Sequence, residues 1–251
     1  MISLRARRAL VTGGSRGIGR ATALLLADCG ADVGIGFRSR EDEAASTVRE
    51  IADRGVRAFS QAADLGTAEG AALLFARTTR EFGGVDLFIG NAGTWPDEDV
   101  PVAQLDDARW RSTMVANVDA MFFACRAAAR AMADGGRVVL VGSTAGQRGE
   151  AMHADYAAAK GAMISFVKSL AIELAPRGIT VNCVAPGWVD TEMCARPFAD
   201  GGRERITAGI PLNRIAAPAD IAGPIVFLCS DQARHITGEI LNVNGGSVLC
   251  G

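Results

Sequence analysis

The chain reads Thr12-Gly13-Gly14-Ser15-Arg16-Gly17-Ile18-Gly19 directly after its first apolar run. That run predicts a β-strand over Ala9–Thr12, and the Ala/Leu face of Ala21–Ala27 predicts a helix after the loop. A glycine-rich turn therefore joins the first strand to the first helix. The same alternation of short apolar runs and helical segments continues along the chain and indicates the fold class.

The other apolar runs are continuous, which is typical of strands covered on both faces. Strands alternating with helices predict right-handed crossovers. We therefore expect an α/β fold, a Rossmann-type doubly wound parallel sheet of about seven strands with helices on both faces. The further predicted strands are Asp32–Phe37, Arg57–Gln61, Asp86–Gly90, Arg137–Ser143, Ile179–Ala185 and Glu239–Val243, and the further helices are Glu41–Ala52, Ala68–Glu81 and Tyr156–Leu174.

The composition is that of a globular protein. The 251 residues are 49% hydrophobic and 22% charged, and no linker divides them, so we expect one domain over residues 1–251. With 26 Lys plus Arg against 28 Asp plus Glu, the net charge of −2 gives no reason to expect nucleic acid or a membrane as partner. The apolar stretch near the N-terminus is too short for a signal peptide, which favours a cytoplasmic protein. The six cysteines lack a CxxC pair and a nearby His, so no metal site is expected.

The glycine loop is suited to a pyrophosphate. A turn between strand and helix brings backbone N–H groups and the positive end of a helix to one spot, and side chains would obstruct the approach. The spacing is GxxxGxG, and the alternative is a tight turn that binds nothing. The predicted cofactor contacts here are Gly13, Ser15, Arg16, Gly17, Ile18 and Gly19.

The end of the second strand bears on cofactor choice. An NAD site places a carboxylate there for the ribose 2′-hydroxyl, but this chain has Phe37-Arg38-Ser39-Arg40. Arg38, with Arg16 and the neighbouring Ser39, could hold a 2′-phosphate by charge-assisted hydrogen bonds. We therefore favour NADP(H) over NAD(H). The alternative is that these loop arginines are only solvated charges.

Two more strand ends carry candidate cofactor residues. After the third strand, Asp64 and Leu65 stand where a carboxylate could meet adenine, and a helix N-cap at Asp64 is the alternative. After the fourth strand, Asn91, Ala92 and Gly93 supply small residues where a bulky side chain would collide with the cofactor.

The catalytic candidates surround the only tyrosine of the chain, Tyr156. Lys160 follows four residues later, so the two side chains share a helix face. An ammonium favours the phenolate, and such a Tyr can exchange a proton with an alcohol oxygen. Ser143, at the end of the fifth predicted strand, is placed to hydrogen-bond the same oxygen. By itself a YxxxK pair can occur on any helix.

Together these residues resemble the short-chain dehydrogenase/reductase family over nearly the whole chain. The resemblance rests on six motifs in order and spacing: TGGSRGIG at 12–19, NAG at 91–93, Ser143, YAAAK at 156–160, PG at 186–187 and GEILNVNGG at 238–246. The stretches around YAAAK, VNCVAPGWVDTEM and IPLNRIAAP are most similar to 3-oxoacyl-acyl-carrier-protein reductases.

The resemblance implies further site residues. It gives a catalytic role to Asn117, which would interrupt its helix and hold a water leading to Lys160. It also implies that Pro186, Gly187, Val189 and Thr191 line the nicotinamide. The following segment, near 188–211, resembles a substrate lid and lacks a clear period, so we expect a mobile insertion. The same family implies a homotetramer or homodimer through helices around 101–132 and 156–175.

The predicted function is an NADP(H)-dependent oxidoreductase that interconverts a ketone and a secondary alcohol, with a 3-oxoacyl thioester among the candidate substrates. One alternative is an NAD-dependent dehydrogenase of a sugar, polyol, steroid or other secondary alcohol. Another is a non-catalytic nucleotide-sensing regulator, which would be expected to lose Tyr156 or Lys160. A loop histidine, His153, is close enough in sequence to touch substrate, although the family chemistry needs no His.

Overall fold

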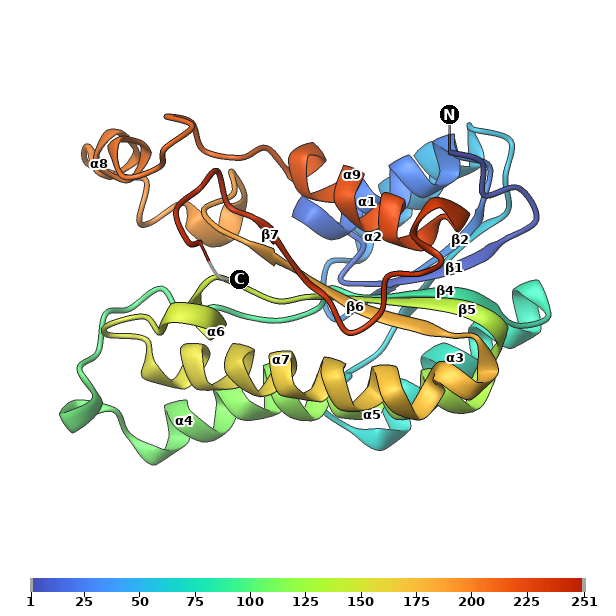
Figure 1. The fold of residues 1–251 in the computed structure, drawn as a ribbon, viewed down its shortest axis with the longest axis horizontal. Coiled ribbons are helices and arrows are strands. Elements are labelled where there is room, and N and C mark those ends of the chain that lie inside the picture. Colours follow the sequence, from blue (N-terminus) through green and yellow to red (C-terminus); the bar gives the residue numbers. More distant parts are fainter. Residues whose placement is uncertain (1, 250–251) are drawn as a thin grey trace.

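A computed structural model describes residues 2–249, which form a seven-stranded parallel sheet in the order β3-β2-β1-β4-β5-β6-β7 (Figure 1). The α/β fold predicted from the sequence is confirmed. The strands are β1 (Arg8–Thr12), β2 (Asp32–Phe37), β3 (Ala58–Ala62), β4 (Val85–Gly90), β5 (Met132–Val141), β6 (Thr180–Pro186) and β7 (Ile240–Val243).

Helices cover both faces of the sheet (Figure 1). One layer holds α1, α2 and α9, and the other holds α3, α5 and α7. Within residues 2–249, no helix is both long and apolar enough to span a membrane. The helices are α1 (Gly17–Asp28), α2 (Glu41–Ala52), α3 (Ala68–Phe82), α4 (Asp107–Met114), α5 (Ala120–Ala131), α6 (Ala145–Arg148), α7 (Ala154–Leu174), α8 (Gly202–Ala208) and α9 (Pro218–Cys229).

The continuous apolar runs are strands because each face of the sheet has its own core. In β4, Leu87 and Ile89 pack on the α1 side, whereas Phe88 between them packs on the α7 side. All three are fully buried. Successive strand side chains point to opposite faces, so a strand buried on both sides carries apolar residues in a continuous run rather than at alternate positions.

Several predicted boundaries differ by one or two residues, and the prediction for β5 was wrong by more. Strand β5 begins at Met132 and ends at Val141, so Ser143 lies two residues beyond the strand. The early start includes a register irregularity between Val85 and Leu87, opposite the positive-φ Gly135. The segment predicted as a mobile insertion, 188–211, contains a 3₁₀ turn at Glu192–Cys194 and helix α8, and its mobility stays a prediction.

The order of the strands places the site. The chain runs outward from β1 to β2 and β3, then returns to the other side of β1 with β4. A parallel sheet has a crevice at the carboxyl ends of its strands where the order reverses. The loops after β1, β4, β5 and β6 meet at this edge, and they carry most of the predicted site residues.

Candidate active site

The glycine loop after β1 leaves its backbone open to close approach. Gly13 and Gly17 have φ values of +65° and +54°, a region that favours glycine. A Cβ on Gly19 would stand 2.2 Å from the carbonyl oxygen of Gly13. The glycine positions singled out in the sequence are therefore required by the turn itself.

Asn91 fixes the shape of this loop. Its Nδ2 donates to the carbonyl oxygens of Thr12, at 3.0 Å, and Gly13, at 3.2 Å. In return, the Thr12 hydroxyl oxygen accepts from the backbone N–H groups of Asn91 and Ala92, at 2.9 and 3.0 Å. Sequence reasoning treated Asn91 only as a small residue and missed Thr12, although a Thr that ends a buried strand is a recognisable signal.

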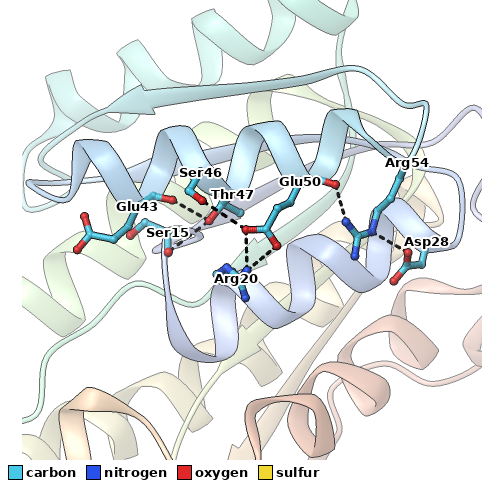
Figure 2. Close-up of polar contacts among 8 residues, drawn as sticks. All are labelled: Ser15, Arg20, Asp28, Glu43, Ser46, Thr47, Glu50 and Arg54. Carbon is cyan, nitrogen blue, oxygen red and sulfur yellow. Dashed lines mark hydrogen bonds and ion pairs between the residues drawn. The ribbon is translucent and has the colours of Figure 1, made fainter.

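Helix α2 packs beside the glycine loop and the start of α1 (Figure 2). The buried Thr47 hydroxyl lies 3.3 Å from the carbonyl oxygen of Ser15 and 2.9 Å from that of Glu43. Arg20 on α1 donates to the Glu50 carboxylate on α2 at 2.7 Å. These contacts hold Ser15 and the start of α1 against α2.

Of the two arginines predicted to hold a 2′-phosphate, Arg16 has an acidic partner that the sequence did not suggest. Glu192, beyond β6, forms ion pairs with Arg16 and, at 3.6 Å, with Arg40. Arg40 also pairs with Glu43 at 3.0 Å. Arg38 is exposed directly after β2. The cationic group at this edge thus includes Arg40, which sequence reasoning left aside.

The turn after β3 decides whether Asp64 is the N-cap of the following helix. Thr67 is the N-cap of α3, because its side chain accepts from the backbone N–H of Gly70 at 3.0 Å. Asp64 instead accepts from Gly66 N–H at 3.0 Å, closing the turn before the helix. An N-cap role for Asp64 is therefore wrong, and the adenine contact stays a prediction. Leu65 and Ala92 line a separate small cavity beside Thr12, and Ser39 is exposed next to Arg38.

Tyr156 and Lys160 lie in the first two turns of α7, both almost fully buried. The Lys160 ammonium is 5.7 Å from the centre of the Tyr156 ring and donates to the carbonyl oxygen of Val141 at 2.9 Å. Burial raises the pKa of Tyr156, whereas a hydrogen bond with Ser143 lowers it in part. Burial lowers the pKa of Lys160 to about 8. The three predicted residues are therefore brought together.

Asn117 lies in a π-helical turn, Val115–Asp119, between α4 and α5. The interruption implied by the resemblance is confirmed. The side chain is buried, and its Nδ2 donates to the carbonyl oxygens of Thr94 and Thr113, each at 3.0 Å. A Cβ on Gly93 would stand 2.7 Å from Asn117 Oδ1 and 3.5 Å from Lys160 Nζ. Asn117 and Lys160 thus approach the same glycine.

An ion pair adjoins Tyr156 that the sequence did not indicate. Asp155 is fully buried and accepts from Thr113 Oγ1 at 2.7 Å and from Arg109 Nε at 3.2 Å. Burial raises the pKa of Asp155, but these hydrogen bonds outweigh it and the pKa is lowered. Since Thr113 also bonds Asn117, the pair joins α4, the π turn and the start of α7.

The loops after β5 and β6 enclose a cleft of about 850 Å³ that includes space open to solvent. Ser143, Tyr156 and Lys160 open into it. Thr191 meets the glycine loop here, since a Cβ on Gly17 would stand 3.4 Å from Thr191 Cγ2. The predicted cofactor residues that line the cleft are Ile18, Asn91 and Gly93 and the four expected at the nicotinamide, Pro186, Gly187, Val189 and Thr191. Among the lining residues that sequence reasoning missed are Trp95, Arg148 and Glu150.

The site fits a nicotinamide dinucleotide. The positive-φ glycines leave a cradle at the N-terminus of α1, and a side chain at Gly93 would close the space beside Asn117 and Lys160. The cleft is continuous from Ile18 in the loop to Tyr156. Among residues 2–249, no group of three or more His, Cys, Asp or Glu side chains is placed to hold a metal ion.

A doubly wound sheet with a glycine loop and a Ser–Tyr–Lys group defines an oxidoreductase of the nicotinamide-dependent class. A family model described as Enoyl-(Acyl carrier protein) reductase matches residues 13–247. The chain is 33% identical to a short-chain dehydrogenase/reductase structure from Brucella melitensis, with a TM-score of 0.92 over 99% of both chains. The chain therefore belongs to the short-chain dehydrogenase/reductase family, whose members act on CH–OH or carbonyl groups with NAD(P).

Particular relatives are similar over the full length. The chain is 40% identical over 250 residues to a 3-oxoacyl-(acyl-carrier-protein) reductase of Vibrio cholerae, covering 99% of this chain and 100% of the relative. It is 36% identical to a short-chain dehydrogenase from Burkholderia cenocepacia in complex with NADP, with a TM-score of 0.92 over 97% of this chain and 98% of the other.

Proposed function

We propose that this protein is an NADP(H)-dependent reductase that converts a ketone to a secondary alcohol, with 3-oxoacyl thioesters as its substrate class. The observation that carries the proposal is the convergence of Ser143, Tyr156 and Lys160 on one cleft beside the glycine loop. A regulator that only senses nucleotides would have no use for this group.

Tyr156 is the proton donor. Because burial raises its pKa, the phenol keeps its proton at neutral pH and can give it to the oxygen of a carbonyl under reduction. Ser143 holds that oxygen and stabilises the charge that develops on it. The bound nicotinamide supplies the hydride to the carbonyl carbon.

Lys160 has two roles. Its ammonium lies near the Tyr156 ring and favours the phenolate left after the proton is transferred. It also lines the cleft beside Gly93, where it can hold the cofactor ribose. Asn117 approaches the same glycine, which supports a relay that returns a proton to Tyr156 through Lys160.

The basic side chains around the end of β2 support NADP(H). Arg16 and Arg40 are close enough to share Glu192, and Arg38 follows the strand without an acidic residue in the position that an NAD site uses. A 2′-phosphate would bind such a cluster by charge-assisted hydrogen bonds. The Burkholderia cenocepacia relative, which is in complex with NADP, supports the same choice.

The Vibrio cholerae relative supports a 3-oxoacyl thioester as substrate, and the matching family description raises enoyl thioesters as the rival. The test is to assay acetoacetyl-CoA and crotonyl-CoA with NADPH and with NADH. We expect acetoacetyl-CoA reduction with a kcat/KM at least about tenfold higher for NADPH, equivalent to about 1.4 kcal/mol of transition-state binding. Preference for NADH, or faster reduction of crotonyl-CoA, would contradict the proposal.

Four features of organisation and location belong to the same proposal. Residues 1–251 act as one domain around the single sheet, and the segment near 188–211 acts as a lid because it contributes Trp188, Met193 and Cys194 to the cleft. The large apolar side chains exposed on α5 and α7, Phe122 and Ile172, support association of copies through these helices. The protein works in the cytoplasm.

A further inference from the structure

One carboxyl group in the cleft has no part in the chemistry proposed above. Glu150 lies between α6 and α7, six residues before Tyr156, and lines the same cleft as Ser143 and Tyr156. Its charge is close enough to raise the pKa of Tyr156, a smaller effect than that of burial. A carboxylate in this position faces the substrate.

Glu150 has positive groups in its vicinity but forms no close ion pair among the described residues. No basic side chain within residues 2–249 lies within 4.0 Å of it. Burial raises its pKa, and the field of His153, a hydrogen bond from the Trp95 indole and the field of Arg148 offset this only in part. A half-buried carboxylate with so few partners costs free energy, which a ligand that donates a hydrogen bond would recover.

Two indoles form a corner beside this carboxyl. Trp95 and Trp188 both line the cleft, with ring centres 6.2 Å apart and planes at 79°. Aromatic rings pair in stacked or edge-on arrangements at centre separations of roughly 4.5 to 7 Å. A third flat ring in the cleft would meet the face of one indole and the edge of the other.

The corner is held in place from outside the cleft. His153 is buried and stacks on Trp95, with ring centres 4.4 Å apart and planes at 19°. Phe198, from the segment before α8, packs on Trp188 at 5.8 Å. Both indoles are therefore fixed by other rings before a substrate arrives, which reduces the entropy lost on binding.

We propose that, beyond 3-oxoacyl thioesters, the cleft takes a second class of substrate: a ketone built on a flat ring that carries, beyond the ring, a hydrogen-bond donor for Glu150. The inference rests on the proposed ketone reduction. The ring packs in the corner of Trp95 and Trp188, its carbonyl oxygen meets Ser143 and Tyr156, and the donor reaches the carboxylate. The donor is a hydroxyl or a protonated amine, since both can pair with a carboxylate.

The test uses three ketones on one scaffold: 2-tetralone, 6-hydroxy-2-tetralone and 6-aminomethyl-2-tetralone. Each is assayed with NADPH on the wild-type protein, Glu150→Gln and Glu150→Met. In the wild type, we expect kcat/KM for a donor-bearing ketone to be at least about tenfold above that for 2-tetralone, the ratio for one charge-assisted hydrogen bond. Glu150→Met should remove most of this ratio.

The two variants separate the two donors. An amide oxygen still accepts from a hydroxyl but offers no charge to an ammonium, so Glu150→Gln should keep part of a hydroxyl preference and lose an amine preference. Glu69→Gln is the matched control, because it neutralises an exposed carboxylate on α3 that does not line the cleft. This variant should keep the wild-type ratio of kcat/KM between donor-bearing and bare ketones.

A binding measurement makes the result independent of turnover. The ketones are titrated against tryptophan fluorescence, since Trp95 and Trp188 line the cleft, and the Kd ratio between donor-bearing and bare ketones is compared for the wild type and Glu150→Met. Equal ratios in both proteins would overturn the inference. Reduction of acetoacetyl-CoA and 2-tetralone with such equal ratios would leave the proposed function standing, whereas failure to reduce any ketone would refute the proposed function itself.

Discussion

The buried charge of Lys160, which its catalytic role requires, should lower the stability of the cofactor-free protein. The side chain is 4% exposed, and burial lowers its pKa from 10.5 to about 8. That drop corresponds to about 3 kcal/mol of destabilisation when the group is charged at neutral pH. Replacing Lys160 by Met removes the charge and keeps much of the volume, but it also loses the hydrogen bond to Val141, worth about 1 kcal/mol. The cofactor-free Lys160→Met variant should therefore be about 2 kcal/mol more stable at pH 7.

The difference in stability between Lys160→Met and the wild type changes sign as the pH rises. Between about pH 8 and pH 10.5, the folded wild type has released the Lys160 proton while the unfolded chain still holds it. Stability rises with pH wherever the unfolded state binds more protons, so the wild type gains over this interval. The advantage of Lys160→Met should shrink across it and become a deficit of about 1 kcal/mol above pH 10.5. Thiols and Tyr156 titrate here in the unfolded chain, because burial raises their pKa values in the folded protein, and this contribution of the unfolded chain is common to both proteins and cancels in the difference.

The measurement is urea unfolding of the cofactor-free proteins from pH 7 to pH 10.5. Lys168→Met is the control, because Lys168 is exposed on the same helix α7 and its removal should change stability by less than about 0.5 kcal/mol at every pH. A Lys160→Met variant that is less stable than wild type at pH 7, or a difference that does not vary with pH, would refute the reasoning. The Lys160→Met variant should also lose ketone reduction, so this substitution would increase stability at the expense of activity.

Three further substitutions test the site. Tyr156→Phe should lower kcat about 10²- to 10⁴-fold with little change in NADPH binding by fluorescence, and near-normal turnover would exclude a proton-donor role. Gly19→Ala would place a Cβ 2.2 Å from the Gly13 carbonyl oxygen, so the Kd for NADPH should rise at least about tenfold without loss of helix by circular dichroism; an unchanged Kd would contradict the cradle. Asp155→Asn leaves Arg109 without its charge partner and should lower the free energy of unfolding by about 2 kcal/mol in urea at pH 7. The loss should be smaller at pH 3, below the ordinary aspartate pKa of 3.8, because the unfolded wild type binds a proton there that the folded protein, with its lowered Asp155 pKa, resists. An equal loss at both pH values would show that the charge of Asp155 is unimportant.

Much of this site could be predicted because it depends on local sequence. Gly13 and Gly19 are dictated by one turn, and the turn follows a strand whose apolar run is visible in the sequence. Tyr156 and Lys160 share a helix face because they are four residues apart. Strand and helix periodicity then predicted a parallel sheet, and parallel strands bring their carboxyl ends to one edge. No contact between distant residues had to be known for these conclusions.

The remaining features depend on how distant segments pack. Glu192 reaches Arg16 across 176 positions of sequence, and no local pattern marks it as a partner. The π turn at Asn117 is invisible in apolar periodicity, since it changes the hydrogen-bond pattern rather than the residue types. From the sequence alone, Glu150 is an ordinary loop charge, and only the fold shows that it lines the same cleft as Trp95 and Trp188. The sequence by itself determined the fold, the cofactor loop and the catalytic pair, because each follows from neighbours along the chain. Only the tertiary structure decided what surrounds the substrate, because those side chains come from loops whose positions are set by packing against the whole sheet.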